Sequence, residues 1–551
     1  MHLALSSEYT HWSNENLNIL LGKWCLKDSN QKFLDKNKYI ISKNIWNHKQ
    51  TKSDYLKCNK IKNKFLKNLS QDLNSIHEVN FSLRLWNIII GWWLQYHIQI
   101  IYDRYKLIKS ALSEKPSKCN IITLPPSDYI SCSSIDYFRF VTSQIGNFYL
   151  LGDVLREFND SDIKFNHIDL TEKEYNEFKH YMDRKKSKDL DFSCKKKNYK
   201  YTFSSVGFSP VNLRLELNEN GHEELPQYES QNNIDIIKRK KLLNSYKTKN
   251  YFECTCIALL RKYIPKSFVE DFSHIIRYTN DNFPTNKGVI YTSNSLFGND
   301  TFKIWTSNQI HRNNSLLVLG QHGNNYGNLE VQSSEVHERD ISDYFITWGW
   351  KEDYKTIPLP SLTLKKYFEK HITPKKDSKS ITFVDSSFPL HRYWFYSSPQ
   401  SSNHLETIQD SLRFYRKIPS SLINNFEHRL YFEKYGWNEE NLLKKNFPNL
   451  NITNSKGNIP LESQLNKSRL CVVNYHSTLL LQCIAADYPI VCYWDFNQWT
   501  LRESVIPLYV DLQNVGILHS SPQSAANFIK QYYCNIDSWW NDNGTIKAKN
   551  A

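Results

Sequence analysis

Glycine is scarce in this chain, which contains only 16 glycines among 551 residues. A glycine in a loop is therefore more informative here than in an average protein. Gly320, Gly323 and Gly327 nevertheless stand close together, and the first two frame His322. Glycines on both sides of a side chain let the backbone turn sharply and let a ligand approach closely. We therefore take this loop as the first candidate site.

The cysteines show no pairing pattern, because their number, 11, is odd and they are scattered. Cys254 and Cys256 have no matching Cys or His pairs at the spacing of a zinc site. The first residues, MHLALSSEYTHW, lack the basic and apolar regions of a secretory signal. We expect a reduced, cytoplasmic protein, with peripheral contact at the inner membrane face left open.

No apolar stretch reaches the roughly 20 residues that a membrane-spanning helix needs. The longest, residues 83–94, is interrupted by Arg84 and Asn87. Its three tryptophans allow contact with a membrane interface, but a buried helix is the commoner reason for such a stretch. We expect a buried helix in the first domain.

The length exceeds that of a single hydrophobic core and predicts two domains, or three. The net charge of +14 predicts an anionic partner, which is a nucleotide, an acidic glycan, a membrane surface or nucleic acid. Lys, Asn and Ile are used heavily along the whole length, so part of this charge reflects overall composition rather than one binding surface.

Short apolar runs that end in polar or glycine-containing turns are typical of parallel strands and indicate an α/β fold. The expected strands are residues 18–21, 120–124, 288–292, 316–319, 344–348, 380–384, 470–473 and 490–494. Pro358 and Pro360 break the chain between two halves. We therefore expect an N-terminal domain over residues 1–355 and a C-terminal domain over residues 356–551.

The loop after the strand at 316–319 contains His322, and Glu335 and Glu338 follow before the next strand. Ligands of open α/β sheets bind beyond the carboxyl ends of the strands, where this loop is expected to lie. A side chain whose pKa lies near the working pH is the best general base, which favours these three residues. The alternatives are a structural turn histidine and a solvated acidic face.

Residues 468–495 are predicted to form a strand, a polar turn, a helix and a strand. Ser477 and Thr478 stand at the helix start, where side chains cap the backbone and free N–H groups attract phosphate. Arg502 is a candidate for contact with the same anion. A plain helix cap is the alternative interpretation.

Several short motifs extend over nearly the whole chain. They are Leu21-Gly22-Lys23-Trp24-Cys25-Leu26, Gly320-Gln321-His322-Gly323, Tyr326-Gly327, His337-Glu338, Ile341-Ser342-Asp343-Tyr344, Thr347-Trp348-Gly349-Trp350, Arg429, Tyr431, Tyr435-Gly436-Trp437, Ser477-Thr478 and Gly516-Ile517-Leu518-His519. In these motifs the chain resembles a family of transferases from bacterial O-antigen and capsule gene clusters. More distantly, it is similar to capsule Kdo transferases and teichoic-acid polymerases.

The resemblance implies a GT-B architecture, in which two Rossmann-like domains face each other across a cleft. Both distant groups use cytidine nucleotide donors. The implied reaction moves a nonulosonic acid, Kdo-like or sialic-like, from a CMP donor onto a glycan or lipid-linked acceptor of a surface polysaccharide. No cofactor and no metal are expected, because helix N-termini and arginine can stabilise the departing phosphate.

We assign candidate residues to three roles. The catalytic candidates are His322, Glu335 and Glu338; the nucleotide-binding candidates are Asn474, His476, Ser477, Thr478 and Arg502; the candidates for contact with the acceptor or donor sugar are Gln321, Tyr326, His337, Arg392 and Arg429. The sequence departs from the family at two places. Asn324-Asn325 replace glycines, which predicts a less open loop, and Gln482 replaces an acidic residue, which predicts an altered ribose or cytidine contact.

Two other functions remain open. One is a CDP-polyol phosphotransferase of the teichoic-acid type. The other is a protein without enzymatic activity that binds anionic glycans through basic and aromatic residues. Nucleic acid is not an expected partner, because no RNA- or DNA-binding motif occurs and the basic residues form no single stripe.

Overall fold

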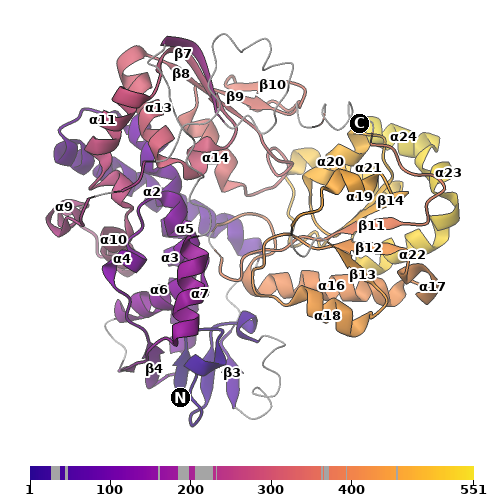
Figure 1. Ribbon diagram of the computed structural model, residues 1–551, viewed down its shortest axis with the longest axis horizontal. Coiled ribbons are helices and arrows are strands. Elements are labelled where there is room, and N and C mark those ends of the chain that lie inside the picture. Colours follow the sequence, from indigo (N-terminus) through magenta and orange to yellow (C-terminus); the bar gives the residue numbers. More distant parts are fainter. Residues whose placement is uncertain are drawn as a thin grey trace.

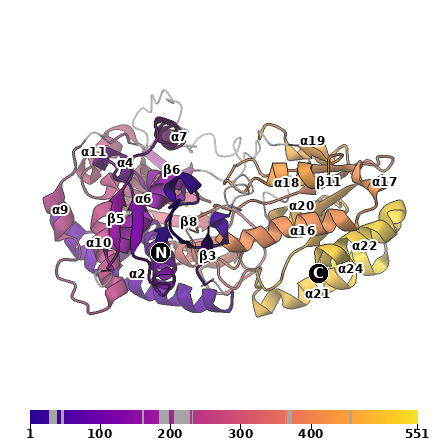
Figure 2. The same cartoon turned by 90° about the horizontal axis from the view of Figure 1, so that it is seen from below.

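The computed structural model describes residues 1–26, 38–43, 48–158, 162–183, 198–204, 228–230, 232–361, 364, 372–392, 394–453 and 457–551. Two lobes lie side by side (Figures 1 and 2), an N-terminal lobe up to residue 361 and a C-terminal lobe from residue 372. Helices surround parallel sheets in both lobes, which confirms the expected α/β fold class.

The N-terminal lobe contains two parallel sheets, where a single Rossmann-like domain with helical additions was expected. The strand order of the first is β3-β2-β1-β4-β5, with all neighbours parallel. Its strands are β1 (His2–Ala4), β2 (Asn18–Leu20), β3 (Tyr39–Ile41), β4 (Lys118–Ile121) and β5 (Lys164–His167).

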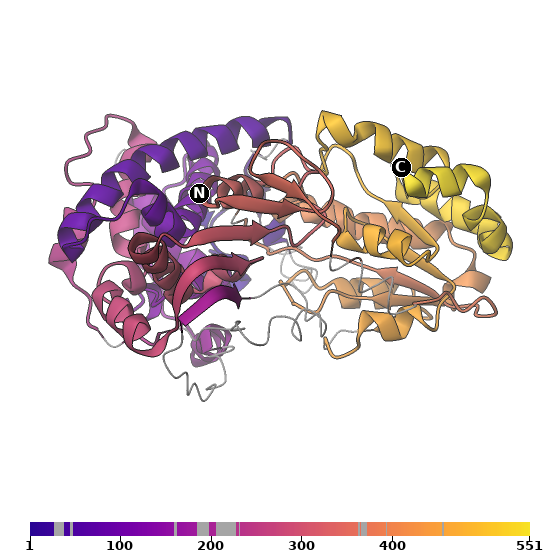
Figure 3. The same ribbon diagram turned by 90° about the horizontal axis from the view of Figure 1, so that it is seen from above.

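The second sheet, in the order β10-β9-β8-β7-β6, is also parallel and lies next to the C-terminal lobe (Figure 3). Its strands are β6 (Asn198–Ser204), β7 (Thr285–Thr292), β8 (Leu316–Gly320), β9 (Tyr344–Thr347) and β10 (Thr356–Pro358). Because β10 pairs with β9, a boundary after residue 355 falls just before the last strand of this sheet.

The C-terminal lobe contains a third parallel sheet, in the order β13-β12-β11-β14-β15-β16. Its strands are β11 (Ile381–Val384), β12 (Phe426–Arg429), β13 (Asn451–Thr453), β14 (Leu470–Val473), β15 (Ile490–Tyr493) and β16 (Leu518–His519). Every residue of β11, β14 and β15 is buried, as expected for strands that are covered by helices on both faces.

Helix α3 (Leu83–Leu112) forms the centre of the N-terminal lobe and contains the tryptophan-rich stretch. Ser82 caps its start by accepting a hydrogen bond from the Leu85 N–H. Trp86, Trp92 and Trp93 are all buried, so the expectation of a buried helix is confirmed and these rings do not face a membrane. In the described part of the chain, no helix combines the length and the apolarity needed to cross a bilayer.

The other helices of the N-terminal lobe pack on α3 or cover its two sheets. They are α2 (His48–His77), α4 (Pro126–Tyr129), α5 (Ser134–Thr142), α6 (Gln144–Arg156), α7 (Glu172–Asp183), α9 (Ile236–Lys241), α10 (Tyr251–Tyr263), α11 (Phe272–Asn282), α12 (Ser295–Gly298), α13 (Asp300–Asn313) and α14 (Ser333–Ile341). Helices α2, α6, α10, α13 and α14 contact α3 directly.

The helices of the C-terminal lobe surround the third sheet. They are α16 (His404–Lys417), α17 (Ser420–Ile423), α18 (Glu439–Asn446), α19 (Leu461–Leu465), α20 (Thr478–Ala485), α21 (Ile506–Asn514), α22 (Pro522–Tyr532), α23 (Ile536–Trp540) and α24 (Asn543–Asn550). Short 3-10 turns lie at Tyr9–His11, Lys23–Cys25, Lys266–Phe268, Ser401–Asn403, Glu503–Val505 and Tyr533–Asn535.

Each lobe extends a segment into the other. Leu390 and Phe395 belong to the hydrophobic core of the N-terminal lobe, and the Phe395 N–H donates to Gln99 Oε1 of α3 (2.8 Å). In the opposite direction, Leu329 is part of the C-terminal core and forms a β-bridge with Leu501. The two lobes therefore share a packed boundary.

Candidate active site between the lobes

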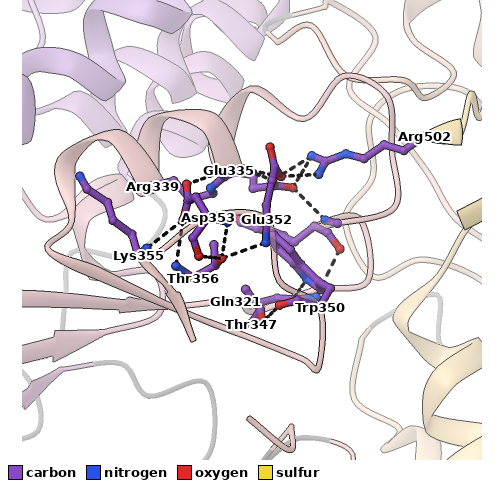
Figure 4. Close-up of polar contacts among 12 residues, drawn as sticks. Gln321, Glu335, Arg339, Thr347, Trp350, Glu352, Asp353, Lys355, Thr356 and Arg502 are labelled. Carbon is purple, nitrogen blue, oxygen red and sulfur yellow. Dashed lines mark hydrogen bonds and ion pairs between the residues drawn. The ribbon is translucent and has the colours of Figure 1, made fainter. Parts of the chain in front are cut away.

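The loop after β8 is fixed by the side chain of Gln321. Its Nε2 donates to the carbonyl of Gly323 (2.9 Å), while its Oε1 accepts from the Trp348 N–H (2.9 Å) and from Trp350 Nε1 (2.8 Å). Figure 4 shows Gln321 beside Trp350. Gln321 thus links its own motif, residues 320–323, to the motif at residues 347–350. Its predicted contact with a sugar stays a prediction.

Gly327 is required in this loop for two reasons. Its φ of +75° lies in the left-handed region, and a Cβ at this position would lie 2.6 Å from Trp350 Nε1. Only glycine lets the backbone approach the Trp350 ring this closely.

His322 lies at the end of a chain of polar contacts that leads into the protein. Its Nε2 is 3.3 Å from the hydroxyl of Tyr326, and that hydroxyl donates to Glu338 Oε1 (3.1 Å). Tyr326 and Glu338 are buried, whereas His322 is exposed to solvent. The structure therefore brings together two catalytic candidates, His322 and Glu338, through a residue predicted to contact sugar.

The surrounding protein favours the neutral form of each of these groups. Protein packed around the His322 ring lowers its pKa to about 4, although hydrogen bonding to the backbone of Gly320 and Ser293 acts in the opposite direction. Burial raises the pKa of Glu338 well above its usual range and also raises that of Tyr326. At pH 7 the His322 imidazole is consequently neutral and free to accept a proton, but its pKa of about 4 makes it a weaker base than the expected pKa near the working pH would.

Glu335, the third catalytic candidate, is completely buried, and both oxygens of its carboxylate have protein partners. It accepts a hydrogen bond from the Gly327 N–H (2.8 Å), and both its oxygens lie 2.8 Å from Arg502 Nη2. Arg339 Nη1 adds a third cationic contact at 3.3 Å. The observed role of this carboxylate is to fix the loop and the two arginines, and its catalytic role stays a prediction.

Arg502 connects the two lobes (Figure 4). Besides Glu335, its guanidinium contacts Glu352 (3.2 Å) and the carbonyl of Leu329 (3.0 Å). The Trp350 ring lies 5.9 Å from the guanidinium carbons of both Arg339 and Arg502. The Arg502 guanidinium thus binds two carboxylates and a backbone carbonyl of the protein. Its predicted contact with phosphate stays a prediction.

The start of α20 lies directly against the loop after β8. Ser477 Oγ caps the helix by accepting from the Leu479 N–H (3.0 Å). The Asn324 N–H donates to Thr478 Oγ1 (3.0 Å), and Asn324 Nδ2 donates to the Ser477 carbonyl (3.0 Å). The loop that carries His322 and the start of α20 therefore contact each other across the lobe boundary.

His476 and Asn474, also assigned to the nucleotide, have protein partners. His476 Nδ1 lies 3.0 Å from Asn325 Oδ1, its Nε2 lies 2.7 Å from the Tyr509 hydroxyl, and burial lowers its pKa to about 3. Asn474 Nδ2 donates to Asp385 Oδ1 (2.5 Å). Asn324 and Asn325 therefore both contact the segment at the start of α20.

The remaining sugar candidates lie apart from His322. His337 points from α14 toward α3, with its ring 5.1 Å from that of Trp92. Arg392 is buried against the core of the N-terminal lobe; burial lowers its pKa to about 10, and its guanidinium lies 4.5 Å from the Phe395 ring. Arg429, at the end of β12, donates to Gln464 Oε1.

A polar network at the ends of β11 and β12 was not predicted. Asp385 Oδ2 lies 3.2 Å from His428 Nε2, and His428 Nδ1 lies 2.9 Å from the Tyr415 hydroxyl. Asp385 also binds Asn474, so this network supports the turn that leads to α20. The available signal was the acidic residue directly after an apolar run, since ligands bind beyond such strand ends.

No curated protein matches the sequence. Among solved structures, MnaA of S. aureus with UDP is 8% identical, with a TM-score of 0.33 over 64% of this chain and 94% of that one. The wall teichoic acid polymerase TagF is 12% identical in two structures. The TagF structure with CDPG has a TM-score of 0.27 and covers 66% of this chain and 88% of the TagF chain. The other TagF structure has a TM-score of 0.23 and covers 50% of this chain and 82% of the TagF chain. The model of the LIC12162 family transferases matches residues 1–551, and the chain therefore belongs to this family of transferases.

Proposed function

We propose that the protein is a glycosyltransferase of GT-B architecture that moves a nonulosonic acid from CMP onto a surface-polysaccharide acceptor. The observation that carries the proposal is the contact between the loop bearing His322 and the start of α20. A neutral imidazole and a helix N-terminus next to each other supply a proton acceptor and a phosphate site. The cytidine donor is proposed from the resemblance described above.

In the proposed reaction an acceptor hydroxyl attacks the anomeric carbon of the donor sugar. The new bond joins the acceptor oxygen to that carbon, while the bond from the carbon to the CMP phosphate oxygen breaks. The hydroxyl proton passes to the His322 imidazole, and the electron pair of the broken bond stays on CMP. Tyr326 and Glu338 orient the His322 ring from its buried side. The Tyr326 hydroxyl contacts both His322 Nε2 and Glu338 Oε1.

The phosphate of CMP is proposed to bind at the start of α20, where backbone N–H groups and the helix dipole favour an anion. In this structure the Asn324 N–H donates to Thr478 Oγ1 at the helix start, and the Asn324 side-chain amide donates to the Ser477 carbonyl. Phosphate binding would replace these contacts. The acceptor, a glycan or lipid-linked glycan, would approach His322 from the solvent side.

The Ser477→Ala, Thr478→Ala double variant is expected to weaken CMP binding by about 1–2 kcal/mol, because a charged phosphate would lose hydroxyl donors. Isothermal titration calorimetry measures the difference. Ser521→Ala is the matched control, since Ser521 caps α22 in the same way away from this site. Equal CMP affinity in the double variant and the wild type would refute the phosphate site.

The choice of donor is tested by thermal unfolding with different nucleotides, because a ligand specific for the folded state raises the melting temperature. CMP should stabilise the protein more than UMP does. Stabilisation by CDP-glycerol without any by CMP would favour the CDP-polyol phosphotransferase instead. Absence of stabilisation by every cytidine nucleotide would favour the glycan-binding alternative.

The pH dependence of kcat/KM tests the role of His322. Because its pKa is lowered to about 4, the ring remains neutral as the pH falls from 8 to 5 and becomes protonated only near 4. We expect kcat/KM to stay level across that range and to fall as the pH passes through about 4, with circular dichroism confirming an intact fold. A fall centred at the ordinary histidine pKa of about 6.5 would contradict this environment.

A further inference from the structure

A cavity of about 470 Å³ lies behind α14, on the side away from Tyr326. Asn59 and Lys62 of α2, Gln95 of α3 and His337 of α14 line it together with the loop after β9, and it is open to solvent. This volume falls within the range of small-molecule sites, roughly 300–1,000 Å³. Glu338 faces the loop that carries His322, whereas His337 faces α3 and this cavity.

Lys62 is the main cationic group of the cavity. Its side chain is only 3% exposed, yet it has no ion pair or hydrogen bond in the described part of the chain. Burial lowers the pKa of Lys62 to about 8, and Asp340 partly opposes this effect. A buried ammonium without a partner is costly, so an anion in the cavity would relieve an existing penalty.

His337 is a second residue of the cavity wall with unsatisfied polar atoms. The residue is 2% exposed, and neither ring nitrogen has a hydrogen-bond partner among the described residues. Burial holds its pKa well below the usual range, so the ring is neutral and offers one donor and one acceptor. Nearly all buried polar groups in proteins are paired, which makes two such groups lining one cavity informative.

The rest of the cavity wall carries charges of both signs. Asp340, Glu352 and Asp353 line it together with Arg339 and Lys355, and Glu352 and Asp353 already bind Arg339. The three carboxylates balance the charges of Lys62, Arg339 and Lys355, and they disfavour a doubly charged phosphate. They suit a ligand with one negative charge and several hydroxyl groups that can donate to carboxylate oxygens.

We propose that this cavity binds a sugar acid, with its carboxylate at Lys62 and His337 and its hydroxyl groups toward Asp340 and Glu352. The site is separate from the space beside His322. Arg339 and Glu352 line the cavity and also belong to the ion-pair cluster of Arg502 (Figure 4). Occupation of the cavity thus acts on the contact that joins the two lobes.

The test is thermal unfolding of the full chain with D-glucuronate, D-glucose or inorganic phosphate. D-Glucuronate should raise the melting temperature, and glucose, which lacks the carboxylate, should not. In calorimetry Lys62→Met should weaken D-glucuronate binding by about 10- to 100-fold, the usual effect of losing a charge-assisted hydrogen bond. His337→Leu should weaken it to a smaller extent.

Lys60→Met is the matched control, because Lys60 lies on the same helix but is exposed. It should bind D-glucuronate like the wild type. Lys62→Met should also remain folded, since methionine keeps much of the buried length and removes an unpaired charge. Equal binding by Lys62→Met and wild type would overturn the proposal, as would stronger stabilisation by phosphate than by D-glucuronate. No nucleotide is used, so failure here leaves the proposed CMP reaction untouched.

Discussion

His322→Ala is expected to lower turnover by about 10²–10⁴-fold, the usual contribution of a positioned acid–base group. The residue is exposed at the boundary between the lobes, and its ring contacts the Tyr326 hydroxyl and the backbone of Gly320 and Ser293 rather than the hydrophobic core. Its loss should therefore change neither the melting temperature nor the affinity for CMP appreciably. Steady-state kinetics, thermal unfolding and calorimetry on the same variant measure all three quantities.

His274→Ala provides the control, because His274 is also exposed but lies on α11, away from this loop. It should leave turnover unchanged. A His322→Ala variant with nearly normal turnover would contradict the assignment of His322 as the base. A variant that lost stability and activity in proportion would identify His322 as a structural turn residue.

Arg502→Ala is expected to destabilise the fold by about 2–4 kcal/mol, since removing one partner leaves a buried carboxylate with fewer compensating charges. Glu335 is completely buried and receives both contacts of 2.8 Å from Arg502 Nη2. Arg339 and the Gly327 N–H remain to compensate part of the loss. Urea unfolding measures the change through the transition midpoint at constant slope.

Arg413→Ala is the matched control. Arg413 also contacts two carboxylates, Glu406 and Asp410, but its side chain is 41% exposed. Surface ion pairs contribute about 0–1 kcal/mol, so this variant should unfold close to the wild type. Equal midpoints for the Arg502 and Arg413 variants would show that the ion pair between the lobes adds little stability.

The strands that could be predicted from sequence are those with buried apolar runs. β14 begins and ends at the predicted residues, and β8 and β15 differ from prediction by one residue at one end. The strands β1 and β3 are three residues long, and the partly exposed β3 lies at a sheet edge. Of the first sheet, β2 and β4 correspond to the expected strands 18–21 and 120–124, whereas β1, β3 and β5 were missed because such short segments bury too little apolar surface to produce a recognisable pattern.

The site was predicted where local sequence determines position. A glycine-flanked histidine after one strand and a hydroxyl pair at a helix start were expected in separate domains, and they lie on loops in contact. The role of Glu335 was less accessible, because its partner Arg502 lies 167 residues away in sequence. A local pattern identifies a carboxylate but does not reveal which distant cation it meets.

The asparagines that contact the turn before α20 have a consequence for the order in which substrates bind. If the donor phosphate takes the helix start, it must first separate Asn324 from Ser477 and Thr478. The same short loop carries His322, so this separation would also move the proposed base toward its working position. An acceptor that arrived earlier would meet a misplaced imidazole. The donor would therefore bind first and the acceptor second, which limits wasteful hydrolysis to the interval between the two events.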